Sequence, residues 1–546
     1  MQLRPMIMGT TRVLSALALF ELAACNTLPE DTDATASNIF GRDRNSDLPK
    51  AEPSPGLLPG TTTWVVPTTP NGLLTDQSWF SVAGAPDGNI YMGACDHLTN
   101  SALYRLNPSD DMLRYLGDAR ASSEAANNWL PGETAQKFHV RPLWYQGRVF
   151  VATADYSNQD DLYLQHRGFH WYAYETRRRN FVDLSASEPN GVAAEHISIF
   201  STALDQSRGM LYGLGSPTSH LYQYNIATGQ TVDLGRSPLL TRPYYNPGRF
   251  MWIDRGGRVY FTVATAGTLA PGEPATPTYV LYWDPIEGWG ANTDWQIAEM
   301  LRTGQWSMDH QHLYILDYPM NLYMFNDQDR TFTKLKKGVL SPEHVSPRTK
   351  TVRVRSMNLS ANEKKLYFIN DTAPVNSLYE WDFMNTDTPL ELATVPAMDA
   401  RVDARYTAFT GHDSWDQEGR FYFTGFGGEG VPSTPNVYFL RVDPVRIKAG
   451  LGVLPGVTEV GIRNFGRLRL VRHGDLSTTI DVILRMTPER GDDSFQTVSM
   501  PAGQTVVEVP GYRWEGRRHV SVIPDGDTYV VEARGHDCDR DDRGED

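Results

Sequence analysis

A repeated pair of an apolar and an aromatic residue is the strongest periodic signal in this chain. Such a pair opens a strand-like run seven times, at Ile90-Tyr91, Val149-Phe150, Leu211-Tyr212, Val259-Tyr260, Leu313-Tyr314, Leu366-Tyr367 and Phe421-Tyr422. A second pair follows each of these, at Leu103-Tyr104, Trp171-Tyr172, Leu221-Tyr222, Leu281-Tyr282, Leu322-Tyr323, Leu378-Tyr379 and Val437-Tyr438. The average period of both series is roughly 50–60 residues, a length typical of four-stranded propeller blades. The pattern predicts an all-β fold whose main body, residues 61–450, is a seven-bladed β-propeller.

Turns and one missing strand indicate how the blades are ordered and how the ring closes. Turns such as Asp87-Gly88 precede most first pairs, and hairpins such as residues 225–230 follow most second pairs. Each blade is therefore expected to run from an inner strand, through the two strands that carry the pairs, to an outer strand. The seventh blade has no outer strand after Val442, whereas the run from Thr61 to Thr69 is an unassigned strand before the first blade. Pairing this run with the seventh blade would close the ring and protect the sheet edges.

The pattern changes after about residue 454 of the chain. Short alternating runs follow at residues 467–471, 480–484, 495–498, 505–509, 519–523 and 529–531. They predict a small C-terminal β-sandwich over residues 455–535, and the charged residues 536–546 predict a disordered tail. The segments 471–477 and 501–505 resemble Calx-beta and related immunoglobulin-like modules, without a clear set of the acidic calcium ligands of those modules.

The N-terminus has the features of a targeting segment. Arg4 and Arg12 supply positive charge, and residues 13–20 form a short apolar stretch. The following residues 22–25, Leu-Ala-Ala-Cys, resemble the lipobox of bacterial lipoproteins, which implies cleavage after residue 24 and lipidation of Cys25. Asn26 in the next position favours, by the same resemblance, an outer-membrane destination if the host is Gram-negative. An ordinary signal peptide with a chance cysteine is the alternative, since Glu21 interrupts the apolar stretch. Residues 25–60 then read as a flexible tether that holds the body away from the membrane.

The charge balance limits the classes of partner. The chain has 50 Lys and Arg against 65 Asp and Glu, a net charge of −15. Removal of residues 1–24, which hold two Arg and one Glu, leaves 48 against 64, or −16. Binding to phosphate backbones needs a basic surface, so we expect no nucleic acid partner. An acidic polysaccharide would be repelled by the chain as a whole and would need a local basic patch.

The residues directly before the second pairs define one mouth of the predicted channel. In a blade of antiparallel strands, the starts of the first and third strands lie on the same face. Around the ring this position is occupied by Ala102, His170, His220, Val280, Asn321, Ser377 and Asn436. Near the starts of the inner strands of blades two to four stand His139, His196 and Arg249, and the connection between blades three and four holds Arg236 and Arg242. We expect these histidines and arginines to converge on one side of one mouth.

Several kinds of chemistry fit histidines and arginines in one cleft. Histidine exchanges a proton near neutral pH, and arginine binds a carboxylate through two parallel hydrogen bonds. Three imidazoles could instead hold Zn²⁺, and the acidic loops 109–111 and 327–329 could hold Ca²⁺, although neither metal is required. Histidines at strand ends also commonly act only as surface hydrogen-bonding groups, and His196 is the one most open to this interpretation. Trp129, Trp289 and Trp306 lie outside the pairs and are candidates for stacking on sugars.

Four segments of blades two and three, residues 136–139, 167–171, 211–213 and 233–236, resemble the ulvan-lyase-like propeller polysaccharide lyases, with oligogalacturonide lyases as more distant relatives. The resemblance implies β-elimination in a uronic-acid polymer. An arginine neutralises the uronate carboxylate, a histidine or tyrosine removes the adjacent proton, and an acid protonates the leaving oxygen. By position, His139 and His170 match the histidines of that family and Arg236 matches its arginine. His220 stands where the family has a tyrosine, which leaves the exact reaction open.

The sequence therefore supports two hypotheses about function. The first is a lipid-anchored polysaccharide lyase of the cell envelope, with His139, His170, His220 and Arg236 as catalytic residues and Arg249, His196 and Arg242 as substrate-binding residues. The second is a propeller without catalytic activity that binds a glycan or a protein as an envelope scaffold. Propellers serve both kinds of function, so the fold alone does not decide between them.

Overall fold

The computed structural model describes residues 48–530 of the chain, with gaps. The gaps are residues 74, 97, 156–161, 266–278, 299, 308–309, 318, 341–353, 361–362, 371–375, 399–405, 413, 417–419, 428–436, 445, 448–458, 465–467, 474–478, 489–493, 510–517 and 522–528. The predicted signal peptide with Cys25, much of the predicted tether and the predicted tail lie outside the described residues. Within the described part, no helix is long and apolar enough to cross a membrane.

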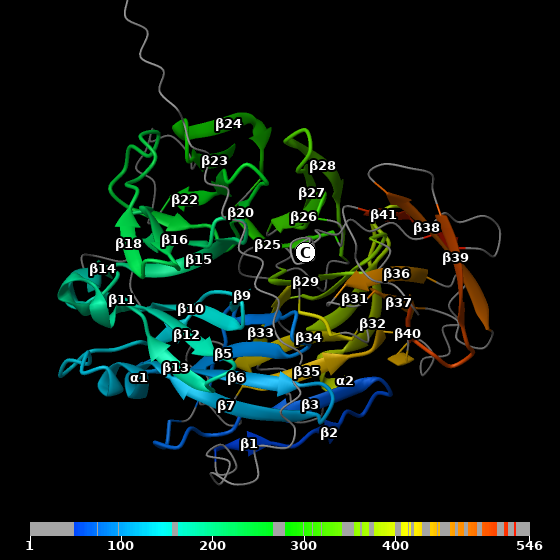
Figure 1. Ribbon diagram of the computed structural model, residues 1–546, viewed down its shortest axis with the longest axis horizontal. Coiled ribbons are helices and arrows are strands. Elements are labelled where there is room, and N and C mark those ends of the chain that lie inside the picture. Colours follow the sequence, from blue (N-terminus) through cyan, green and yellow to red (C-terminus); the bar gives the residue numbers. More distant parts are fainter. Residues whose placement is uncertain are drawn as a thin grey trace, which may run out of the picture.

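Seven blades of antiparallel strands stand around a central axis and form a propeller, in which the last two blades are joined into one continuous sheet (Figure 1). Blade 1 contains β4 (Val82–Gly84), β5 (Ile90–Cys95), β6 (Ser101–Asn107) and β7 (Met112–Asp118); blade 2 contains β8 (Lys137–Phe138), β9 (Leu143–Tyr145), β10 (Arg148–Ala154), β12 (Trp171–Glu175) and β13 (Asn180–Asp183). Blade 3 contains β15 (Ser198–Asp205), β16 (Met210–Ser216), β17 (Leu221–Asn225) and β18 (Gln230–Asp233); blade 4 contains β20 (Trp252–Ile253), β21 (Val259–Phe261), β23 (Tyr279–Asp284) and β24 (Gly288–Gln296), extended by the pair β19 (Tyr245–Pro247) and β22 (Val263–Thr265).

The remaining blades repeat the same meander. Blade 5 contains β25 (Leu301–Trp306), β26 (His312–Asp317), β27 (Asn321–Asn326) and β28 (Thr331–Lys337); blade 6 contains β29 (Ser356–Leu359), β30 (Leu366–Ile369), β31 (Ser377–Trp381) and β32 (Leu390–Thr394); blade 7 contains β33 (Tyr406–His412), β34 (Phe421–Gly427) and β35 (Tyr438–Val442). The connections hold α1 (Ala119–Ala125), α2 (Val395–Met398), the 3-10 helices η1 (Leu162–Gln165), η2 (Ser185–Ser187) and η3 (Pro189–Gly191), and the paired strands β11 (Gly168–Phe169) and β14 (Ala194–Glu195).

The repeated pairs are the residues that build the core. Every first pair lies in the second strand of its blade, and all fourteen residues of the first pairs are buried. The second pairs lie in the third strands, except that Val437 directly precedes its strand, and Tyr282 is the one member of these pairs that is not fully buried. Because neighbouring residues of a strand face opposite sides of the sheet, each pair supplies both faces of a blade with apolar surface. The predicted seven-bladed propeller is confirmed.

The ring is closed by a strand from the N-terminal side, as the sequence predicts. β3 (Thr61–Val65) pairs antiparallel with β35 and places Trp64 opposite Phe439. Part of the segment predicted as a flexible tether is also ordered. β2 (Ser54–Pro55) pairs with β3, and β1 (Lys50–Ala51) pairs with β7 at the outer edge of blade 1. The prediction for these residues was wrong because exposed strand edges offer unpaired backbone groups that a neighbouring segment can bond.

Two further sheets follow the propeller. One contains β36 (Glu459–Asn464), β37 (Leu468–His473) and β40 (Val506–Glu508), and the other contains β38 (Ile480–Pro488), β39 (Ser494–Met500), β41 (Arg518–Ser521) and β42 (Tyr529–Val530). The sequence pattern predicts each of these strands except β36. The resemblance of this region to Calx-beta modules stays a prediction.

Candidate functional site

Extra residues in the inner strands aim side chains into the middle of the propeller. In each of blades 1 to 6, the inner strand contains a β-bulge. Between two successive positions that pair with the neighbouring strand, the inner strand has one or two residues more than that neighbour. The bulged segments include Phe80, His139, Phe200, Arg249, Arg302 and Arg355, in order from blade 1 to blade 6. Bulges of this kind re-aim a side chain and are common beside functional sites.

These bulges assemble a group of cations and aromatic rings that we call the channel cluster. Its members are Trp79, Lys137, His139, Phe200, Arg249 and Arg355, from blades 1, 2, 3, 4 and 6. The Phe200 ring lies 4.1 Å from the Arg249 guanidinium carbon, 4.6 Å from the His139 ring and 5.5 Å from Lys137 Nζ. Cations at these distances from a ring face are attracted to its π electrons.

Trp79 is the second ring around which the channel cluster is built. It stacks on His139 with ring centroids 6.0 Å apart and an angle of 12° between the planes. Lys137 Nζ lies 6.0 Å from its ring and the Arg355 guanidinium carbon 5.1 Å from it. His139 is therefore held between rings from blades 1 and 3, and it is 97% buried, since its exposed fraction is 3%.

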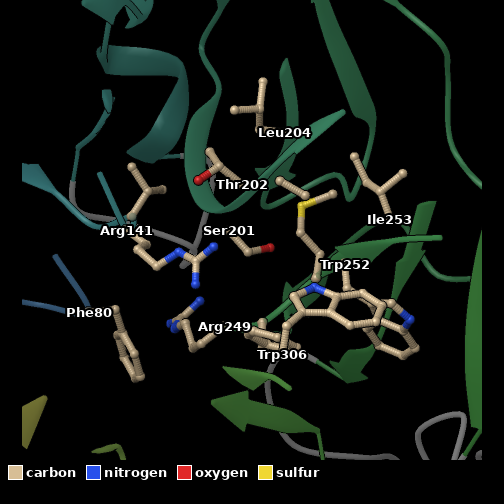
Figure 2. Close-up of a pocket in the computed structure, with 13 residues that line it drawn as sticks. Phe80, Arg141, Ser201, Thr202, Leu204, Arg249, Trp252, Ile253 and Trp306 are labelled. Atoms are coloured by element: carbon tan, nitrogen blue, oxygen red, sulfur yellow. The ribbon is translucent and has the colours of Figure 1, made fainter. Parts of the chain in front are cut away.

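A small cavity adjoins the channel cluster (Figure 2). Its volume is about 70 Å³, and its walls come mostly from β15, from β20 and from the residues just before β20. The segment before β4, the segment after β8 and the last residue of β25 complete the lining. Apolar side chains dominate the lining, with Arg141, Arg249, Ser201 and Thr202 as the polar members. In Figure 2 the guanidinium groups of Arg141 and Arg249 point toward the same space, beside the Ser201 side chain. Ser201 is buried, and its hydroxyl has no hydrogen-bond partner among the described residues.

His170 stands at its predicted position before β12, inside a buried network of charges. Its Nε2 lies 2.9 Å from Glu133 Oε1 and its Nδ1 lies 3.1 Å from Asp183 Oδ2. Desolvation by burial lowers the pKa of His170, but the hydrogen bonds that its ring donates to these two carboxylates outweigh burial and raise the pKa to about 8. In turn, the bond to His170 helps to hold the pKa of Glu133 and Asp183 below their usual values, against the effect of burial. Both ring nitrogens of His170 are thus engaged by protein groups.

Further side chains complete this network. Arg167 Nη1 lies 3.0 Å from Glu133 Oε2 and also donates to the Asn128 carbonyl oxygen. The Ser123 hydroxyl and the Asn128 amide donate to Asp183 Oδ2 at 2.7 and 2.9 Å. A histidine cation between two carboxylates with this support is suited to joining blade 2 to the segment that connects blades 1 and 2.

The other predicted histidines lie in separate surroundings. His220 is partly exposed, and its Nδ1 lies 2.9 Å from Asp233 Oδ2. His196 has a positive φ of 59° and its Nδ1 lies 2.6 Å from the His166 carbonyl oxygen. His166 itself lies 3.9 Å from the buried carboxylate of Asp155, whose pKa is raised by burial.

The arginines of the connection between blades 3 and 4 organise that loop. Arg236 donates to the carbonyl oxygens of Leu240, Arg242 and Pro243, and its guanidinium carbon lies 5.8 Å from the Tyr245 ring. The Arg242 backbone N–H donates to the Tyr245 hydroxyl at 3.2 Å. Arg236 therefore binds the backbone of its own loop.

Of the seven predicted site residues, the structure brings two into one cluster. His139 and Arg249 both contact the Phe200 ring, whereas His170, His220, His196 and Arg236 have the separate partners given above. The sequence reasoning missed Trp79, Lys137, Phe200, Arg141 and Arg355 as site residues. The sequence does contain a signal for the bulges. In each of blades 1 to 6, the bulge residue named above stands ten or eleven positions before the first apolar-aromatic pair of its blade.

The tryptophans and acidic loops singled out in the sequence have different environments. Trp306 lines the cavity, Trp289 donates to the Leu234 carbonyl oxygen at 3.1 Å, and Trp129 lies 6.0 Å from the Arg120 guanidinium carbon. The loop carboxylates of Asp110, Asp111 and Asp327 bind Arg114, Arg441 and Arg255, respectively. Within the described ranges, no three His, Cys, Asp or Glu side chains are arranged to hold a metal ion.

Comparisons with known proteins add the following. No family model matches the chain, and no curated protein matches it. Among solved structures, an oligogalacturonate lyase in complex with manganese is 11% identical, with a TM-score of 0.43 over 73% of this chain and 97% of that chain. A mitotic checkpoint complex chain is 10% identical, with a TM-score of 0.41 over 69% of this chain and 96% of that one. The structure of U3-55K is 10% identical, with a TM-score of 0.41 over 67% of this chain and 95% of that chain.

Proposed function

We propose that the propeller binds an anionic glycan, a polymer that contains uronic acid, at its channel cluster. The observation that carries the proposal is the concentration of Lys137, Arg249 and Arg355 around two aromatic rings, in a chain whose net charge is −15. Because the chain as a whole is negatively charged, binding of an acidic polysaccharide needs a local group of basic residues such as this one. Aromatic faces bind the apolar faces of sugar rings, and the cations supply the charge complement.

The proposal is tested by direct measurement of binding. Affinity electrophoresis or calorimetry with a panel of uronate polymers is expected to detect binding that weakens as salt rises. Trp79→Ala is expected to reduce the affinity, since it removes the ring that contacts His139, Lys137 and Arg355. Arg178→Gln is a matched control for overall charge in the polymer assay, because Arg178 is 79% exposed in an outer hairpin of blade 2. If the wild type binds none of the polymers, the glycan proposal fails and the protein-scaffold hypothesis takes its place.

A second candidate function is a polysaccharide lyase, and the meeting of His139 and Arg249 on Phe200 favours it. In this reaction Arg249 would neutralise the uronate carboxylate, and His139 would take the proton from the adjacent carbon. The electrons of that C–H bond then form the new C=C bond, and the glycosidic oxygen leaves with a proton from water or an acidic side chain. The expected readout is ultraviolet absorbance of the unsaturated product, lost in His139→Gln. Absence of that absorbance from a wild-type protein that binds polymer would rule out this candidate.

We also propose that Cys25 carries lipid and anchors the protein at the cell envelope. The support is the apolar stretch and the lipobox-like residues 22–25. Wild type should partition into detergent and Cys25→Ser into the aqueous phase. Aqueous partitioning of wild type from intact cells would contradict the anchor.

A further inference from the structure

The cavity beside the channel cluster has the composition of an anion site. Two guanidinium groups, of Arg141 and Arg249, are directed at one space of about 70 Å³. Arginine keeps its positive charge at every physiological pH and offers several donors in a planar fork. Two such groups aimed at a small space attract an anion that carries several acceptor atoms.

A buried hydroxyl supplies a second, independent observation. Ser201 is 2% exposed and lines the cavity, and its Oγ has no hydrogen-bond partner among the described residues. The Thr202 hydroxyl, also in the lining, is in the same state. Buried polar groups are normally hydrogen-bonded, because a buried donor without a partner destabilises the folded protein. An oxyanion in the cavity would accept from Ser201 and from both arginines.

The place of the cavity along the channel separates it from the predicted mouth. Leu204, Ile253 and Trp306, which line it, stand at or next to the last residues of β15, β20 and β25. The predicted mouth lies at the starts of these inner strands. The cavity is therefore farther along the channel, and Arg249 is the residue shared with the channel cluster.

We propose that this cavity binds a single small oxyanion group, of the carboxylate, sulfate or phosphate class, between Arg141, Arg249 and Ser201. The volume admits one such group and little more. Apart from Thr202, the other lining residues are apolar, and charge-assisted hydrogen bonds are stronger in such surroundings than in water. The group can come from a free small anion or from the acidic substituent of a glycan. The site does not require that the protein bind a polymer.

The test measures small-anion binding to the whole protein by calorimetry, with sodium sulfate, phosphate, acetate and glucuronate as separate probes at matched ionic strength. One saturable site is expected, and its affinity should fall about tenfold or more in Arg141→Gln and less in Ser201→Ala. Arginine supplies a positive charge and several donors to the anion, whereas serine supplies one neutral donor. Arg178→Gln, which removes an exposed charge, should bind as wild type does. Far-ultraviolet circular dichroism and a melting curve establish that each variant is folded.

The outcomes distinguish this site from the proposed glycan function. Tighter binding of glucuronate than of acetate identifies the sugar acid as the source of the group, whereas preference for sulfate or phosphate identifies a free inorganic anion. If none of the four probes binds to wild type, or if folded Arg141→Gln binds them as wild type does, the proposal is overturned. Either result leaves the polymer assay with Trp79→Ala as an independent test of glycan binding.

Discussion

Replacement of His170 with glutamine should show how much the buried charge network of blade 2 and its preceding connection contributes to stability. Side chains of His170, Glu133 and Asp183 are only 3%, 2% and 0% exposed. Glutamine keeps a polar group there but removes the cation, so two buried carboxylates lose a charged partner. Breaking a buried ion pair from one side costs about 3–5 kcal/mol. We expect a loss of that order in the free energy of unfolding near pH 6.

The stabilisation that the charge network provides should depend on pH, because its three members have shifted pKa values. A histidine whose pKa rises from 6.5 to about 8 on folding contributes about 2 kcal/mol that is fully present below pH 6.5. That contribution is lost as the pH rises through 8. The carboxylates, whose pKa values are lowered, contribute stability above their ordinary values of 4.5 for Glu133 and 3.8 for Asp183 that is lost in acid. The network should therefore stabilise the protein most between about pH 5 and 6.5.

The assay is urea unfolding of wild type and His170→Gln, followed by tryptophan fluorescence at pH 6 and pH 9. The gap between the two proteins should be about 2 kcal/mol larger at pH 6. A gap of equal size at both pH values would refute the assignment of a buried imidazolium. His220→Gln is the matched control, because the His220–Asp233 pair is 32% and 45% exposed. We expect it to change stability by less than about 1 kcal/mol.

Three further changes test other parts of the fold. Trp64→Ala removes a fully buried ring from the closing strand, which contacts Phe439 at 5.9 Å, and should cost about 3–5 kcal/mol in urea unfolding; a loss below about 1 kcal/mol would contradict the role of this strand in closure. Gly168→Ala should lower the melting temperature, because its φ is 141° and a Cβ there would lie 2.1 Å from the Ala194 carbonyl oxygen; an unchanged melting curve would show that β11 and β14 adjust freely. Asp317 is buried, and desolvation raises its pKa to about 6. The free energy of unfolding of wild type should therefore rise by about 1 kcal/mol as the pH falls from 7 to 5, and that of Asp317→Asn should not. Equal increases in both proteins would contradict the raised pKa.

The propeller could be predicted from the sequence because its signal lies in strands that every blade repeats. Pairs such as Leu211-Tyr212 occupy equivalent buried places, so packing imposes the same residue types seven times. The closing strand followed from the outer strand that blade 7 lacks. Strands β1 and β2 were missed because they are short and carry no apolar alternation, and they form by adding to edges that already exist.

The candidate site was predicted only in part, for two physical reasons. One extra residue in an inner strand turns the next side chain to the other face, so the register that places His170 does not place Phe200 or Arg355. The acidic partners of His170 are also distant in sequence: Glu133 precedes it by 37 residues, in a loop without a periodic pattern. A single sequence does not distinguish a histidine that is buried between two carboxylates from a histidine that faces a cleft.

Closure by β3 has a consequence for the order in which the chain becomes structured. Trp64 pairs with Phe439, so the first strand of the propeller waits for a partner that is made about 375 residues later. At the usual speed of synthesis, about 5–20 residues per second, that delay is roughly 20–75 s. During this time the sheet edges that β3 and β35 offer each other are open to other chains. A folding factor that covers the N-terminal segment, or holds the whole chain until its last blade is complete, would therefore act on this protein at that stage.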